Sequence, residues 1–341
     1  MEKIYCTNCG AVNWSNANFC INCGQPLIKV HANQTNTIPF RVRDLFSEVF
    51  KRHSREEAEE LLIAGTAKTT PAIETLEPFK LRPWLFSRAL VFTLFLAVLL
   101  GILTSINGRI GNVVALDAVI AISVPVSALV LFFEINIYRN LSLYQIIQIF
   151  LVGGLLAIIV TVMLDYVVGN QGPQNLMGAF ETGITEEIGK LIVAAYFVSR
   201  LRTKRILEGL LIGAAVGAGF AAFENIMYMV NDQTGALAST NIALLRALIS
   251  IGGHTEWCAI ATAGLVIALN NQAWDKNKLF QGSFLGCLMS VIVLHTVWDW
   301  LGVTSWLVIV ILIMITWSMV LSLVQTGLKE ANLIKFSALG N

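Results

Sequence analysis

The chain has 341 residues, of which 56% are hydrophobic and 13% charged, with a formal net charge of +1 and a mean hydropathy of +0.70. This balance excludes a water-soluble globular protein and predicts a polytopic membrane protein. The small net charge gives no support to a role in nucleic-acid binding, which requires an excess of basic residues.

A cysteine-rich segment occupies residues 1–30 and contains two C-x2-C pairs separated by ten residues. Each pair directs two thiolates toward one point, so the pattern predicts a closed tetrahedral zinc ribbon with a structural ion. Two disulfides or an iron centre are the alternatives. The ribbon itself contains few basic residues, so we expect it to dock a cytosolic protein rather than nucleic acid. The expected zinc ligands are Cys6, Cys9, Cys20 and Cys23.

Residues 31–82 are expected to form cytosolic amphipathic helices and a proline-containing linker. The pattern at 40–64 predicts two short helices, the second starting at a capping box of Ser54 and Glu57. The basic flanks of the first helix would suit an anionic membrane surface. A helical hairpin packed on a cytosolic surface explains the pattern equally well.

The remainder predicts an all-α membrane domain at 83–330, followed by a cytosolic tail at 331–341. Eight apolar runs are long enough to cross a bilayer. They lie at about 84–106, 113–134, 144–168, 178–199, 206–230, 241–270, 279–301 and 304–326.

Loop charges predict the orientation of these spans. The loops at 200–205 (RLRTKR) and 275–278 (DKNK) are basic, and Arg139 lies between the second and third runs. In the alternate loops, the only basic residue is Arg109. The positive-inside rule therefore predicts a protein of the cell membrane with both termini in the cytoplasm. A reducing compartment favours zinc over disulfides in the ribbon.

Ionisable residues interrupt four consecutive runs, although a charge near the bilayer centre costs roughly 2.5–3.5 kcal/mol on insertion scales. The run at 241–270 also contains Arg246, near its outer end, and Glu256. At about 1.5 Å per residue, most of these groups are expected in the outer half of the bilayer. The candidate catalytic residues are Glu186, Glu187, Lys190, Glu224, His254, His295 and Asp299.

Other features of these runs are assigned structural roles. Gly209, Gly213 and Gly217 form a small-residue track that predicts close helix packing. Five carboxylates near the ends of runs are expected to be solvated: Asp117, Glu134, Asp165, Glu181 and Glu208.

The ionisable cluster suits hydrolysis. Paired carboxylates near a lysine can differ in proton affinity, so that one accepts a proton from water, and the histidines can stabilise an oxyanion or protonate a leaving amine. A catalytic zinc ion held by glutamate and histidine is an equally consistent alternative. A buried ion-pair network with a purely structural role is a further one.

Three motifs in order resemble those of the PrsW-type intramembrane proteases, which are distantly similar to the prenyl-protein CAAX proteases. They are EEIGK at 186–190, FAAFE at 220–224 and HTVWD at 295–299, with His254 as an isolated membrane histidine. The resemblance covers about residues 178–301, which would form the catalytic core.

The resemblance implies an intramembrane endopeptidase that cleaves a membrane-anchored protein near its extracytoplasmic face. In some members of the family the substrate is an anti-sigma factor in a stress response. By motif match, Glu186 and Glu187 would include the general base, and His254 and His295 would be oxyanion partners or metal ligands. The family does not decide between a glutamic and a metallo mechanism. A proton-coupled transporter and a non-catalytic scaffold with a partner-binding ribbon are the alternative functions.

Overall fold

The computed structural model describes residues 3–5, 12–14, 17, 22, 41–66, 68–78, 81–107, 110–231, 236–270, 276–301 and 305–339. In the N-terminal segment, strands β1 (Lys3–Tyr5) and β2 (Val12–Trp14) pair antiparallel, with Lys3 opposite Trp14. The four cysteines predicted to bind zinc lie outside the described residues.

The segment before the first long helix contains a 3-10 turn at Val42–Phe46 and helix α1 (Arg55–Leu62). The predicted capping box of α1 is confirmed: the Ser54 hydroxyl accepts from the Glu57 N–H, and the Glu57 carboxylate accepts from the Ser54 N–H, each at 3.1 Å. The first predicted helix is only a short 3-10 turn in the structure, and the Asp44 side chain at its start accepts from the Arg41 N–H at 3.3 Å.

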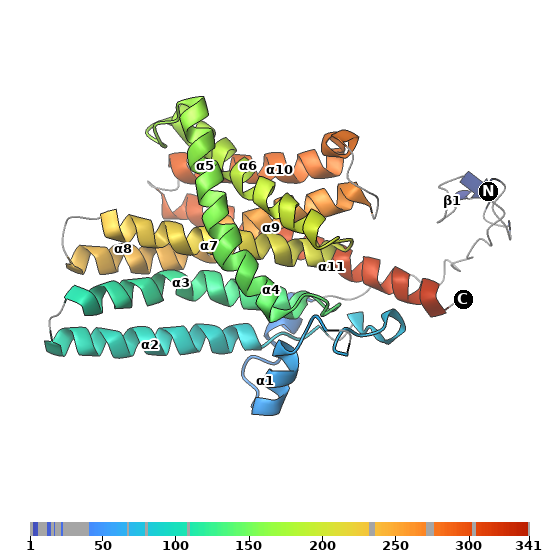
Figure 1. The fold of residues 1–341 in the computed structure, drawn as a ribbon, viewed down its shortest axis with the longest axis horizontal. Helices are drawn as coiled ribbons and strands as arrows, with labels where there is room; N and C mark the ends of the chain where they lie inside the picture. The colour runs from blue at the N-terminus through green and yellow to red at the C-terminus, as the bar shows by residue number, and fades with distance from the viewer. Residues whose placement is uncertain are drawn as a thin grey trace.

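The rest of the described chain is a bundle of long helices (Figure 1). In Figure 1, the C-terminal ends of α2 and α7 lie at one end of the bundle, and the C-terminal end of α11 lies at the other. The helices are α2 (Leu85–Asn107), α3 (Ile110–Ile135), α4 (Leu143–Gln148), α5 (Gly154–Val168), α6 (Leu176–Arg200), α7 (Ile206–Asn231), α8 (Ala236–Ile249), α9 (His254–Leu269), α10 (Gly282–Leu301) and α11 (Trp306–Leu339).

Six helical segments in the described chain are long and apolar enough to cross a membrane. One of them, Leu143–Val168, joins α4 to α5 through a π-helical turn at Ile149–Gly153. Each of the eight predicted runs is helical, but two do not qualify by length and composition: α6 contains several charged residues, and the run at 241–270 is divided. The protein is therefore a multi-pass membrane protein whose membrane part is all-α.

The run at 241–270 was expected to be continuous, and the structure divides it into α8 and α9. A 3-10 turn at Ser250–Gly252 and Gly253, whose φ of −114° and ψ of −137° are not helical, separate the two helices. Consecutive glycines favour such a break because they lose more backbone entropy in a helix than other residues. The Trp317 indole on α11 donates to the freed Ile251 carbonyl at 2.5 Å. The break makes His254 the first residue of α9.

Helix α7 is the buried centre of the bundle and packs most closely against α9. The predicted glycine track forms this contact. A Cβ atom on Gly213 or Gly217 would collide with the carbonyl oxygen of Cys258 or His254, and one on Gly209 would lie 2.8 Å from Val266 Cγ2. Because these three glycines have no side chains, the backbones of α7 and α9 lie close together, and His254 can reach the face of α7.

The five carboxylates near the helix ends were expected to be solvated, but several of them are buried or hydrogen-bonded within the protein. Glu134 on α3 accepts hydrogen bonds of 2.8–2.9 Å from the N–H groups of the first turn of α2. Glu208 is 7% exposed and accepts from the backbone before α7. Asp165 accepts from the Thr185 hydroxyl at 2.6 Å. These groups satisfy helix termini and link neighbouring helices, which a linear sequence does not reveal.

Candidate active site

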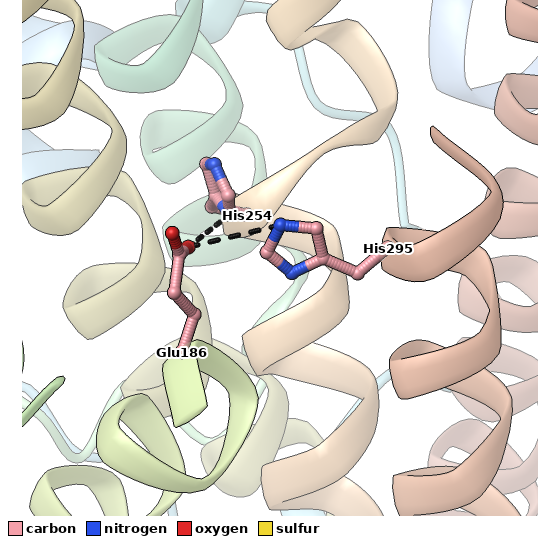
Figure 2. Close-up of side chains that lie close together, drawn as sticks. All are labelled: Glu186, His254 and His295. Carbon is pink, nitrogen blue, oxygen red and sulfur yellow. Dashed lines mark ion pairs between the residues drawn. The ribbon is translucent and has the colours of Figure 1, made fainter. Parts of the chain in front are cut away.

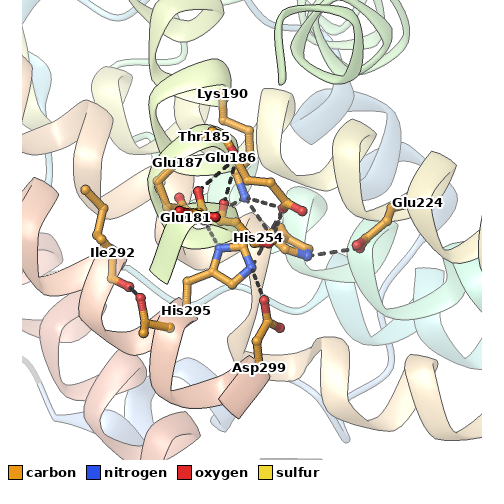
Figure 3. Close-up of polar contacts among 12 residues, drawn as sticks. Glu181, Thr185, Glu186, Glu187, Lys190, Glu224, His254, Ile292, His295 and Asp299 are labelled. Atoms are coloured by element: carbon orange, nitrogen blue, oxygen red, sulfur yellow. Dashed lines mark hydrogen bonds and ion pairs between the residues drawn. The ribbon is translucent and has the colours of Figure 1, made fainter. Parts of the chain in front are cut away.

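Helix α6 supplies a fully buried ion pair at the centre of the site. Lys190 Nζ lies 2.7 Å from Glu187 Oε1, and both side chains have no exposed surface. The two residues are three apart in the sequence, so the helix places them on one face. The start of α6 is fixed by the Asn175 side chain, which accepts from the Gly178 N–H at 3.0 Å. Figure 3 shows this pair among the other polar side chains of the site.

His295 on α10 joins this pair through one ring nitrogen. Its Nδ1 lies 2.8 Å from Glu187 Oε1, and its Nε2 lies 3.4 Å from Asp299 Oδ2, one turn further along α10. The imidazole is almost completely buried, while the Asp299 side chain is partly accessible. Two carboxylates therefore fix the position of the ring.

His254 on α9 is held in the same manner by α6 and α7. Its Nδ1 lies 2.8 Å from Lys190 Nζ, and its Nε2 lies 3.0 Å from Glu224 Oε2. Glu224 Oε2 is also 2.6 Å from Arg246 Nη2 on α8. The bundle thus fixes the second imidazole through a chain of contacts that extends to a fourth helix.

Glu186 lies between the two histidines (Figure 2). Its Oε2 is 3.8 Å from His254 Nδ1 and 3.8 Å from His295 Nε2. Within the described part of the chain, this buried oxygen has no hydrogen-bond partner. Glu186 also lines a cavity of about 240 Å³ between α5, α6 and α7. Within this network, Glu186 is therefore the carboxylate that combines an oxygen without a hydrogen-bond partner with access to a cavity.

The structure brings all seven candidate catalytic residues into one network across α6, α7, α9 and α10. Sequence reasoning assigned no role to Arg246, although a charge inside an apolar run is a signal of function. Arg246 pairs with Glu224 and also donates to Asn225 Oδ1 at 2.5 Å. Glu256 is fully buried in the first turn of α9, where the helix dipole favours a carboxylate.

The geometry fits a metal ion. One oxygen of Glu186 and one ring nitrogen each of His254 and His295 lie within 4.8 Å of one another. Two histidines and a glutamate are a frequent donor set for catalytic zinc. Metal-binding histidines usually hold a carboxylate with the other ring nitrogen, as Glu224 and Glu187 do here. A bound ion would displace two contacts of these ring nitrogens, that of Lys190 with His254 Nδ1 and that of Asp299 with His295 Nε2.

The formal charges of the site support the same conclusion. Four carboxylates (Glu186, Glu187, Glu224 and Asp299) face two permanent cations, Lys190 and Arg246. Two negative charges are therefore in excess if both imidazoles are neutral. Buried charge of one sign is costly unless it is compensated. A divalent cation or two protonated histidines would neutralise the excess.

Comparison with known proteins places this site in a family. The model of the PrsW family of intramembrane metalloproteases matches residues 142–324, and that of a zinc-ribbon domain matches residues 5–27. The chain is similar to Protease PrsW of Clostridioides difficile (strain 630), with 22% identity over 212 residues, which are 59% of this chain and 87% of the relative.

It is also similar to Protease PrsW of Halalkalibacterium halodurans, with 28% identity over 179 residues, which are 51% of this chain and 78% of the relative. No solved structure gives a significant match. The family model covers more than half of the chain and includes all seven candidate residues. The protein carries an N-terminal zinc-ribbon domain and belongs to the PrsW family of intramembrane proteases.

Proposed function

We propose that this protein is an endopeptidase that cleaves a membrane-anchored protein near its extracytoplasmic face, with Glu186, His254 and His295 as the reactive centre. One observation carries the proposal. His254 contacts Glu224 through Nε2 and His295 contacts Glu187 through Nδ1, while the other ring nitrogen of each lies 3.8 Å from Glu186 Oε2, an oxygen without a hydrogen-bond partner in the described part of the chain.

The reaction requires a group that accepts a proton from water and returns it to the leaving amine. We assign this role to Glu186, because it lines the cavity and its carboxylate is not committed to Lys190 alone. Glu187 is assigned a supporting role, since it is fully buried against Lys190 and His295. Glu224 and Asp299 orient the histidines, and Lys190 compensates the charge of the two glutamates.

Glu186, His254 and His295 are also the residues that would hold a catalytic zinc ion, in addition to the structural zinc proposed for the four cysteines of the ribbon. When bound, zinc polarises a carbonyl and makes a water molecule more acidic. Glu186 would then be a ligand through Oε2, the oxygen that lies 3.8 Å from a ring nitrogen of each histidine.

The depth of the site supports cleavage near the outer face. Glu224 lies seven residues before the end of α7, which is roughly 10 Å along the helix axis. Asp299 lies two residues before the end of α10. With the basic loops in the cytoplasm, both ends are extracytoplasmic. We therefore also propose that the protein resides in the cytoplasmic membrane with both termini inside, that the ribbon docks a cytosolic protein, and that an anti-sigma factor is a candidate substrate.

The proposal is tested by mapping new protein N-termini in membrane fractions. Cells would produce the intact protein, Glu186→Gln or Glu181→Gln at equal abundance; Glu181 is a control on the same helix. We expect termini near the outer face of a membrane protein with the intact protein and with Glu181→Gln, and none of them with Glu186→Gln. Identical profiles for all three proteins under several stresses would refute the proposed activity.

A further inference from the structure

The cavity beside Glu186 combines apolar side chains with polar ones, among them Asp165 and Glu224, and opens on the side of the bundle. Its volume is about 240 Å³, and its walls include Ile158 and Val162 of α5 and Met227 of α7. Val162 is 58% exposed and Met227 48% exposed, so the cavity opens between α5 and α7 on a surface that lipid covers in a membrane. A segment that reaches Glu186 from the bilayer can therefore pass between these helices.

Thr161 on α5 is the feature of this cavity that packing does not explain. Its side chain lines the cavity and is 5% exposed, and its hydroxyl has no hydrogen-bond partner in the described part of the chain. Threonines on a helix usually donate to the carbonyl four residues earlier. Thr93, Thr104, Thr262 and Thr296 all do so here. A buried hydroxyl without a hydrogen-bond partner destabilises the folded protein, so its missing partner requires an explanation.

The hydroxyl lies against α6 close to Glu186. A Cβ atom on Gly189 would collide with Thr161 Oγ1, so the absence of a side chain at Gly189 provides the space for this hydroxyl. Gly189 follows Glu186 by three residues and lies on the same face of α6. The Thr161 hydroxyl, which has no hydrogen-bond partner, therefore lies within about one helical turn of the Glu186 carboxylate, the group assigned to water activation.

We propose that the cavity between α5, α6 and α7 holds the substrate backbone beside Glu186, and that the Thr161 hydroxyl donates a hydrogen bond to one of its peptide carbonyls. The inference rests on the proposed function. A membrane helix pairs its own carbonyls, and it must unwind locally before a peptide bond can be attacked. Unwinding frees carbonyl oxygens in a medium without water, and each requires a donor. An apolar substrate side chain would then lie between Ile158, Val162 and Met227.

Thr161→Val and Thr161→Ser provide the test, because valine keeps the shape without the hydroxyl and serine keeps the hydroxyl. Thr93→Val on α2 is the matched control, since it removes a threonine hydroxyl far along the chain from the site. The readout is the rate at which Glu186-dependent N-termini appear after induction, together with the thermal unfolding midpoint of each purified full-length variant.

We expect Thr161→Val to slow cleavage about 10-fold, Thr161→Ser to stay within about 3-fold of the intact protein, and Thr93→Val to have no effect. The unfolding midpoint of Thr161→Val should not fall, because the hydroxyl has no partner to lose. If Glu186-dependent termini form at the full rate in Thr161→Val, this inference alone is overturned. The same holds if Thr161→Val has a lower unfolding midpoint that explains its slower cleavage. A complete absence of Glu186-dependent termini would overturn the proposed function and this inference with it.

Discussion

Arg246 on α8 and Glu224 on α7 form an ion pair with Nη2 2.6 Å from Oε2. The same oxygen of Glu224 holds His254 Nε2 at 3.0 Å. The guanidinium also lies 4.0 Å from the centre of the Tyr228 ring, which restricts its position. Arg246 thus acts on the reactive centre through Glu224 and is a positioning residue.

Replacing Arg246 by Gln is expected to lower the cleavage rate about 10–100-fold, because partners of this kind orient metal-binding and catalytic histidines. The rate of formation of Glu186-dependent termini measures the effect. Arg205→Gln is the control, since Arg205 pairs with Glu330 at the opposite end of α7, at 3.8 Å. Equal rates for both variants would remove the positioning role of Arg246.

Replacing Lys190 by Met is expected to lower the free energy of unfolding by about 3–5 kcal/mol, because it leaves Glu187 buried without its cation. Thermal unfolding of the purified protein in detergent measures this change. Lys204→Met removes an exposed lysine and should change stability by less than about 0.5 kcal/mol. A stable Lys190→Met protein would show that the pair is not needed for the fold.

Gly217→Ala tests the close packing of α7 on α9. The new methyl group would press on the His254 carbonyl and on Cys258, so stability should fall by about 1–3 kcal/mol and cleavage should fall with it. Gly286→Ala on α10 is the control, because a methyl group there meets no atom within 4 Å. It should be neutral or stabilising by up to about 1 kcal/mol. The reverse order of effects would contradict the packing described here.

Metal content tests the zinc assignments separately from activity. The purified full-length protein should contain about two zinc ions per chain, one in the ribbon and one at the histidines. Elemental analysis should show about one ion in the His254→Asn/His295→Asn variant and about one in Cys6→Ser/Cys9→Ser. A histidine variant with an undiminished zinc content would eliminate the second site.

Much of the site was accessible from the sequence because its residues recur at helical spacing. Glu187 and Lys190 share a face of one helix, as do His295 and Asp299, so each pair meets without any knowledge of the tertiary structure. The glycine track on α7 likewise predicted a close helix contact, and α9 provides it. The side-chain pairs and the glycine track could both be predicted because helix periodicity alone places their residues on one face.

Features that depend on contacts between helices were not predicted. The break before His254 depends on a glycine pair and on a tryptophan of α11 that satisfies the freed carbonyl. Glu134 appeared to be a boundary charge, but it caps α2, a helix about fifty residues earlier in the chain. The sequence gives no reason to select Thr161, because the role proposed for it rests on a hydroxyl without a hydrogen-bond partner, which only the structure reveals.

Hydrolysis in ¹⁸O-labelled water tests the proposed role of Glu186 most directly. Full-length protein would be reconstituted in lipid vesicles with a substrate identified by N-terminal mapping, and the new C-terminus would be analysed by mass spectrometry. We expect one ¹⁸O atom in that carboxylate with the intact protein and with Glu181→Gln, and no product with Glu186→Gln. Cleavage by Glu186→Gln at the rate of the intact protein would contradict the central role of Glu186.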